Sequence, residues 1–223
     1  MEWVRIKVLF LVPTYISVPV RAYKSIIELL TKVTEPFEFL VSVRESCFVH
    51  ENRNKLAERA LKLHKKNKLD YVVWLDSDIE FRFNDVLRLI KSLIDSKADM
   101  LSGVYYSKIS GKVHPLIQVW DRKDDQYYWI TPKEFKEKPD VFKSDSVGFG
   151  FLVMKPSVLV RMFNEFKRPF NFRVQSNGEL LGEDLMFCEQ ARDLGFKLFV
   201  DKRINVGHIK GVTDKSTYED SLK

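Results

Sequence analysis

Apolar residues in the first half of the chain follow two patterns, short continuous runs and residues spaced three or four apart. The continuous runs have the length of buried strands and cover residues 6–12, 39–43, 71–75 and 100–106. The helical spacing covers residues 25–30, 52–64 and 86–94, and Asn84 is the expected N-cap of the last of these helices. Helices that alternate with apolar strands predict an α/β protein with an open, mostly parallel, twisted sheet flanked by helices.

The pattern changes after residue 106. Strand-like pieces at residues 116–120 and 126–130 flank a polar turn, which predicts a small antiparallel portion in the second half. Residues 132–143 mix Lys, Glu and Asp with prolines, and we expect them to form an exposed loop at the rim of the site. An apolar stretch at 147–154, a short helix opened by Pro156, and a helix from Glu183 to near Gly195 complete the pattern.

Length and composition fit one domain. With 223 residues, 45 % of them apolar, the chain is long enough to fill a single core. We expect one domain with a first half over residues 1–106, a second half over residues 107–209 and a flexible C-terminal segment over residues 210–223.

Charge and cysteine content bear on location and partners. No apolar run reaches the roughly eighteen residues of a membrane span, and the run at residues 8–12 stops at Pro13. Cys47 and Cys188 lie in unlike contexts, which indicates neither a disulfide framework nor a zinc cluster. We therefore expect a cytoplasmic protein. The net charge of +6 suits anionic ligands, a membrane surface or nucleic acid equally, so a peripheral membrane contact stays open.

The stretch YVVWLDSDIEF is the most informative one for chemistry. It places Asp76, Ser77 and Asp78 directly after an apolar strand, and open α/β sheets bind ligands outside the carboxyl ends of their strands. Carboxylates two residues apart can reach one ion, and oxygen ligands suit Mg²⁺ or Mn²⁺, which bridge diphosphate oxygens. The alternative is a turn that only caps the strand.

Three further features carry candidate chemistry. Glu183 and Asp184 open a helix, whose free amides stabilise carboxylates, although acids are common there without any function. Gly148 and Gly150 in VGFGF permit close approach of a ligand, or serve a bulge or tight packing. His208 lies beside a glycine and either reaches a ligand or is a core histidine.

In order, the stretches VPTY, ENRN, LDSDI, GFGFLVM, GEDLMFCEQARDLGFKLFVD and VGHIKG resemble those of the GT-A fold glycosyltransferases. The resemblance covers nearly the whole chain and is closer to the large, mostly inverting glycosyltransferase family 2. It implies that residues 1–106 are the nucleotide-binding half and residues 107–209 the acceptor-binding half. It implies a hexosyltransferase that moves a sugar from a UDP- or GDP-sugar to an acceptor hydroxyl, with Mn²⁺ or Mg²⁺ as cofactor. The acceptor would be a carbohydrate, a lipid-linked molecule or a protein, and nucleic acid is not an expected partner.

The resemblance also implies roles for single residues. Asp76, Asp78 and His208 would hold the metal, and Asp184 would be the general base. The residues that would bind the nucleotide sugar are Pro13, Thr14, Tyr15, Arg53, Asn54, Asp76, Ser77, Gly150, Glu183 and Lys210. Between residues 43 and 52 the chain departs from the family pattern, so that Glu45 is only a weak candidate for reading the base.

Other functions stay open at the level of sequence. A retaining GT-A enzyme would share the fold and the metal site. A sugar-1-phosphate nucleotidyltransferase would carry a glycine-rich phosphate loop, which this sequence lacks. A non-catalytic protein that binds carbohydrate or nucleic acid could use the aromatic residues Trp120, Tyr127, Tyr128 and Trp129. The donor, the acceptor and the oligomeric state are not determined by the sequence.

Overall fold

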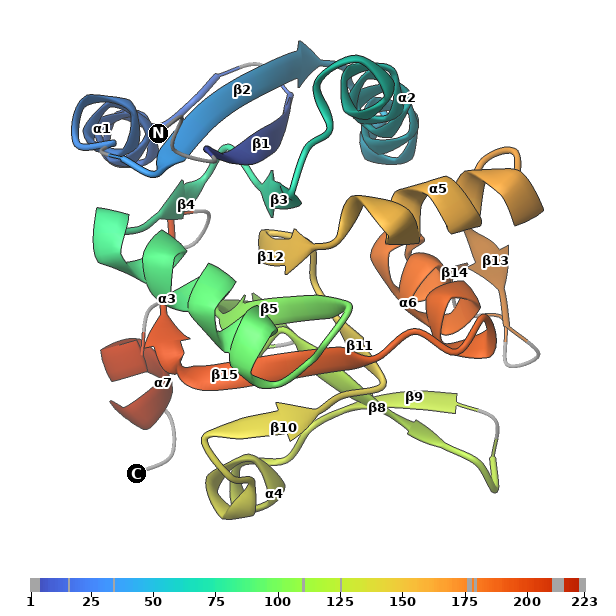
Figure 1. The fold of residues 1–223 in the computed structure, drawn as a ribbon. Coiled ribbons are helices and arrows are strands. Elements are labelled where there is room, and N and C mark those ends of the chain that lie inside the picture. The colour runs from blue at the N-terminus through green and yellow to red at the C-terminus, as the bar shows by residue number, and fades with distance from the viewer. Residues whose placement is uncertain are drawn as a thin grey trace.

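A mixed sheet lies at the centre of the computed structural model, which describes residues 5–15, 17–33, 35–109, 111–124, 126–175, 178, 180–209 and 215–220. In spatial order its strands are β10 (Val141–Lys143), β15 (Leu198–Asn205), β5 (Met100–Val104), β12 (Phe151–Met154), β3 (Tyr71–Leu75), β1 (Ile6–Thr14) and β2 (Phe37–Glu45). Strands β1, β2, β3, β5 and β15 run in one direction, and β12 and β10 run in the other. The predicted mostly parallel sheet is confirmed (Figure 1).

Helices cover both faces of this sheet (Figure 1). One face carries α2 (Val49–Asn67), α5 (Pro156–Glu165) and α6 (Glu183–Asp193), and the other carries α1 (Val20–Thr31) and α3 (Phe83–Asp95). Strand β1 is apolar without interruption from Val8 to Val12 because this part of the strand is buried on both sides. Leu9 and Leu11 pack on the α2 side, whereas Val8, Phe10 and Val12 pack on the α1 side.

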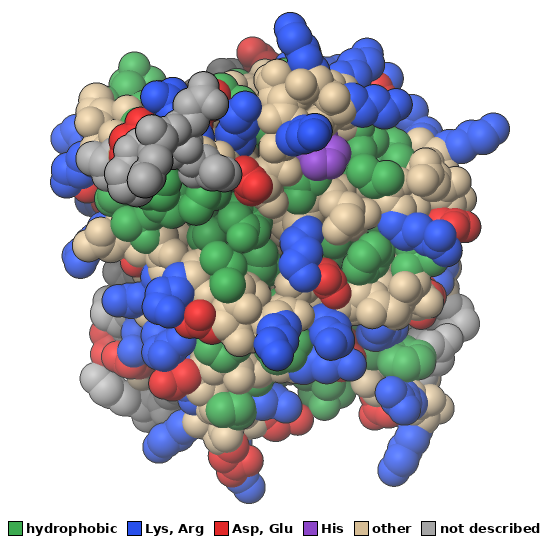
Figure 2. Space-filling view, viewed as in Figure 1, with side chains coloured by type: hydrophobic (Ala, Val, Ile, Leu, Met, Phe, Trp, Pro, Cys, Tyr) green, Lys and Arg blue, Asp and Glu red, His purple; other side chains and the backbone are tan. Residues whose placement is uncertain are grey.

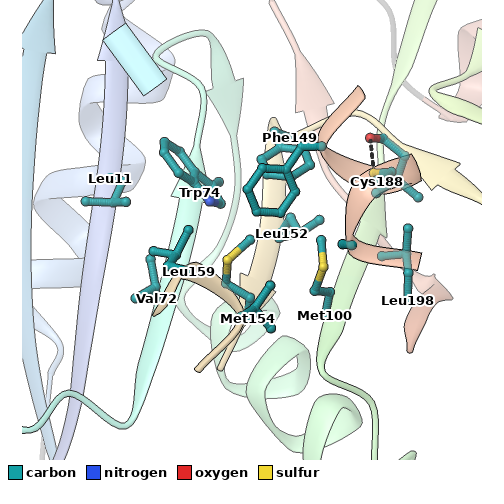
Figure 3. Close-up of a cluster of buried hydrophobic side chains, with 14 of the residues drawn as sticks. Leu11, Val72, Trp74, Met100, Phe149, Leu152, Met154, Leu159, Cys188 and Leu198 are labelled. Atoms are coloured by element: carbon teal, nitrogen blue, oxygen red, sulfur yellow. Dashed lines mark hydrogen bonds between the residues drawn. The ribbon is translucent and has the colours of Figure 1, made fainter. Parts of the chain in front are cut away.

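Trp74 and Phe149 lie among aliphatic side chains in the core on the α2 side (Figure 3). Trp74 of β3 is fully buried, and its ring centroid lies 5.9 Å from that of Phe149 and 5.1 Å from that of Phe170. Burial of each such side chain stabilises the fold by about 1.5–3 kcal/mol. The end of β3, where the Asp76 motif begins, is therefore held rigidly.

Short elements form the rest of the described chain. They are β4 (Ile79–Glu80), β6 (Tyr106–Ile109), β7 (Lys112–Pro115), β8 (Ile117–Asp121), β9 (Gln126–Trp129), α4 (Pro132–Glu137), β11 (Ser146–Val147), β13 (Arg173–Val174), β14 (Leu180–Leu181), β16 (Gly207–His208) and α7 (Lys215–Asp220). Strands β8 and β9 pair as an antiparallel hairpin, which confirms the antiparallel portion predicted for the second half.

Three local predictions are wrong. Residues 132–143 are not a loop but form α4 and β10, because Thr131 and Glu134 make a reciprocal capping box and Phe142 is buried. Helix α3 begins at Phe83 rather than after Asn84, and the Asp85 carboxylate accepts the backbone N–H of Arg82. The strand expected over residues 100–106 is interrupted between Val104 and Tyr106, where the chain leaves the central sheet.

The C-terminal segment is described in part. Residues 215–220 form helix α7, and Lys210 lies outside the described residues. Every helix within the described ranges is too short or too polar to cross a bilayer.

Candidate active site

A pocket of about 360 Å³ opens at the carboxyl ends of β1 and β3. Its lining consists of Pro13, Thr14, Tyr15, Ser46, Cys47, Val49, Asn52, Asp76, Ser77 and Asp78. The structure thus brings the predicted nucleotide loop at residues 13–15 together with the predicted metal motif at residues 76–78. Tyr15 is 61 % exposed, so a face of its ring is accessible at the rim.

Asn52, a residue that the sequence did not single out, holds this pocket together. Its side-chain nitrogen donates to the carbonyl oxygens of Thr14, at 3.1 Å, and of Arg44, at 2.8 Å. Because Thr14 ends β1 and Arg44 lies near the end of β2, one amide fixes both walls. Asn54, two residues further along α2, bonds instead to the backbone of His50 and Phe170 and is not part of the pocket lining.

Arg53 links the two acidic motifs. Its Nη2 donates to both carboxylate oxygens of Asp76, at 2.9 and 3.3 Å, and its Nε donates to Glu183 Oε1 at 3.1 Å. Arg53 is only 3 % exposed. Burial opposes the charge of the guanidinium, but the two carboxylates outweigh that effect and raise the pKa of Arg53. Burial raises the pKa of Asp76, and Arg53 acts against this rise.

His208 faces Asp78 across the mouth of the site. Its Nε2 lies 3.3 Å from Asp78 Oδ2, and its Nδ1 lies 2.9 Å from the carbonyl oxygen of Tyr106. A carbonyl oxygen only accepts, so Nδ1 carries a hydrogen, and in the neutral ring the lone pair of Nε2 points toward Asp78. A backbone carbonyl that orients an imidazole in this way is typical of metal-binding histidines.

The donor set fits a divalent ion that is shared with a ligand. Within the described ranges, no three side chains of His, Cys, Asp or Glu are grouped so as to hold a metal by themselves. Of the three predicted ligands, Asp78 and His208 are adjacent, while Asp76 is engaged by Arg53. Mg²⁺ sites commonly use one or two carboxylates together with substrate phosphates, and Asp78 and His208 would supply the protein's part of such a site.

Asp184 lies in the first turn of α6, after the N-cap Gly182. One of its carboxylate oxygens accepts the backbone N–H of Leu185 at 2.9 Å. Burial, with a further contribution from neighbouring Glu183, raises the pKa of Asp184 to about 7, and Arg53 opposes this rise. A carboxyl group that titrates near neutral pH is suited to proton transfer.

Tyr105 is the other residue that sequence reasoning missed. Its hydroxyl accepts the backbone N–H of Gly150 at 2.8 Å, and its ring makes an edge contact with His208 at 5.5 Å between centroids. A Cβ on Gly150 would lie 2.6 Å from Cζ of Tyr105, and one on Gly148 would lie 2.1 Å from its hydroxyl. The geometry therefore favours tight packing against Tyr105 as the role of Gly148 and Gly150.

Replacing Gly150 by alanine tests this packing. We expect Gly150→Ala to destabilise the fold by about 1–3 kcal/mol, because the added methyl meets a buried ring that cannot move away. Gly207→Ala is the control, since the nearest atoms to its Cβ belong to Glu80 at 3.4 Å or more. Thermal unfolding checks both variants, and equal melting temperatures would contradict the packing argument.

Two of the solved structures that share this architecture differ in how much of their own length the match covers. The crystal structure of A197 from STIV has 18 % sequence identity and a TM-score of 0.54, covering 91 % of this chain and 85 % of that one. The crystal structure of GalNAc-T7 with UDP, GalNAc and Mn²⁺ has 11 % identity and a TM-score of 0.57, and it covers 90 % of this chain. The match spans 43 % of the GalNAc-T7 chain. No protein-family model and no curated protein matches the sequence. The fold is that of the GT-A glycosyltransferases.

Proposed function

We propose that this protein is a glycosyltransferase that moves a sugar from a nucleoside diphosphate donor to an acceptor hydroxyl with inversion, as the resemblance to glycosyltransferase family 2 implies. The observation that carries the proposal is the joining of three groups at one sheet edge. They are the pocket at the ends of β1 and β3, the Asp78–His208 pair at its mouth, and a carboxyl group, Asp184, whose pKa is about 7. GalNAc-T7, which shares the fold, was solved with UDP and Mn²⁺, and this supports a nucleotide sugar as donor.

In this proposal the pocket binds the nucleotide. The ring of Tyr15 stacks on the base at the rim, and the walls that Asn52 fixes hold the ribose. Asp78 and His208 would hold Mn²⁺ or Mg²⁺, which when bound supplies positive charge to the diphosphate leaving group. The donor would be a UDP- or GDP-sugar, and the acceptor a carbohydrate, a lipid-linked molecule or a protein.

Asp184 acts on the acceptor. Its carboxylate takes the proton of the acceptor hydroxyl while that oxygen forms a bond to the anomeric carbon. The bond from the anomeric carbon to the diphosphate breaks in the same step, and the nucleoside diphosphate leaves with the electron pair. A single displacement inverts the anomeric configuration. NMR of the product tests this step. An inverted anomeric configuration supports it, whereas a retained configuration would make the protein a retaining glycosyltransferase.

Nucleic acid is not a partner in this proposal, because binding it would need a broad basic surface. On the face seen in Figure 2, Lys and Arg side chains are spread out with acidic side chains among them, rather than gathered into one patch. Nucleic-acid binding relies on contiguous positive charge that meets successive phosphates. The face seen in Figure 2 therefore does not favour nucleic acid as a partner.

The pH dependence of transfer follows from Asp184. The base is active only when ionised, and burial raises its pKa from 3.8 to about 7. We therefore expect kcat/KM to rise with pH up to about 7 and to fall about tenfold per pH unit well below it. Initial rates between pH 5 and 8 measure this, and a rate that stays level down to pH 5 would contradict a base with a raised pKa.

A further inference from the structure

Arg53 lies where a guanidinium can join distant parts of the chain. It belongs to α2, and its two carboxylate partners are 23 and 130 residues away in sequence. Asp76 follows β3 in the nucleotide-binding half, whereas Glu183 is the first residue of α6 in the second half. The Arg53 side chain is 4 % exposed and that of Glu183 is 10 % exposed, so this ion pair is almost entirely out of water.

Two aromatic rings fix the plane of the guanidinium. Its Cζ lies 5.5 Å from the ring centroid of Trp74 and 5.5 Å from that of Phe149. Both rings are fully buried, and Figure 3 shows them close together in the core on the α2 side. A guanidinium over an aromatic face gains electrostatic energy that grows when water is excluded. Of the three guanidinium nitrogens, Nε and Nη2 hold the two carboxylates, while Nη1 is buried without a hydrogen-bond partner among the residues that the structure describes.

We propose that Arg53 is a positioning residue that locks the Asp76 carboxylate to the start of α6 and thereby sets the place of the base Asp184, instead of binding the donor diphosphate. The catalytic part of this inference rests on the proposed function. Asp184 follows Glu183 directly on the first turn of α6, so a shift of the Glu183 carboxylate moves the base. With Asp76 held by Arg53, Asp78 and His208 are the side chains that would hold a metal.

The geometry needs arginine rather than any cation. Nε serves Glu183 and Nη2 serves Asp76, so the two carboxylates are bridged by different nitrogens of one rigid, planar group. A lysine ammonium is a single point on a flexible stem and cannot reproduce that fork. Arg53→Lys therefore keeps the charge but releases one carboxylate.

The test compares Arg53→Lys with Arg59→Lys. Arg59 lies on the same helix and donates to the backbone oxygen of Val43 at an exposed position. For each protein, kcat and KM for the donor are measured together with the Kd of UDP in the presence of Mn²⁺. We expect Arg53→Lys to lower kcat about tenfold to a hundredfold, as small misplacements of catalytic groups do, while the Kd stays within about threefold. Arg59→Lys should match wild type in all three quantities.

Two results would overturn the inference. If Arg53→Lys raised the Kd of UDP tenfold and preserved kcat, Arg53 would be a diphosphate ligand. If both kcat and Kd stayed unchanged, Arg53 would be a core cation without influence on the base. A substrate-free double-mutant cycle gives an independent check. Arg53→Lys and Glu183→Gln should have non-additive effects on the free energy of unfolding, and strict additivity would contradict the link. If wild type transfers no sugar, the proposed function fails while this cycle still decides on the link.

Discussion

Asp184→Asn is expected to reduce sugar transfer at least about a hundredfold, because general-base assistance contributes about a hundredfold to ten-thousandfold in rate. The asparagine keeps an oxygen that can accept the backbone N–H of Leu185, which Asp184 accepts at 2.9 Å, but it cannot take the acceptor's proton. The fold and the affinity for nucleotide should stay near those of wild type. Initial rates, thermal unfolding and calorimetry with UDP measure the three properties.

Asp193→Asn is the matched control for this variant. Asp193 is the last residue of α6, it is exposed, and it lies two to three turns away from the pocket end of the helix. We expect it to transfer sugar at the wild-type rate. If Asp184→Asn also did so, Asp184 would be a helix-start acid only, and Glu183 would become the next carboxylate to examine as the base.

Asp78→Ala is expected to weaken the metal-dependent binding of UDP or GDP at least about tenfold, since loss of even an outer-shell partner commonly costs ten- to a hundredfold in metal affinity. The reason is the position of Asp78, whose Oδ2 faces His208 Nε2 at 3.3 Å. Calorimetric titrations with and without Mn²⁺ or Mg²⁺ measure the effect. Asp95→Ala is the control, because Asp95 pairs with Lys91 at an exposed end of α3.

Asp76→Ala should behave differently from Asp78→Ala. It removes one of the two carboxylates that neutralise the buried Arg53, so its main expected effect is on stability. The metal hypothesis would be contradicted if wild type and Asp78→Ala bound UDP equally well and without any metal.

The layers of the fold follow from local sequence. A continuous apolar run such as residues 8–12 is explained only by a strand that is buried on both faces, and helices on both faces supply that cover. Residues 132–143 are rich in charge, yet they start with a helix-start signal that outweighs their composition. A capping box between Thr131 and Glu134, with Pro132 in the first turn, starts helix α4.

The site could be predicted only as far as its motifs are local. Asp76 and Asp78 follow a strand, and Glu183 and Asp184 open a helix, so both pairs are visible in the sequence. The burial of Arg53 depends on contacts with residues up to 130 positions away, and no local pattern encodes it. Tyr105 was missed for the same reason, since its fit against Gly148 and Gly150 exists only after β5 and β12 have come together.

The release of free UDP or GDP from a panel of nucleotide sugars, with Mn²⁺ and candidate acceptor sugars present, tests the central claim most directly. The account predicts release from at least one donor, stimulated by an acceptor and abolished by a metal chelator. It also predicts that Asp184→Asn releases nucleotide at most about a hundredth as fast. Tight binding of nucleotide sugars without any release, with every donor and acceptor, would contradict the account and make the protein a binder instead of a transferase.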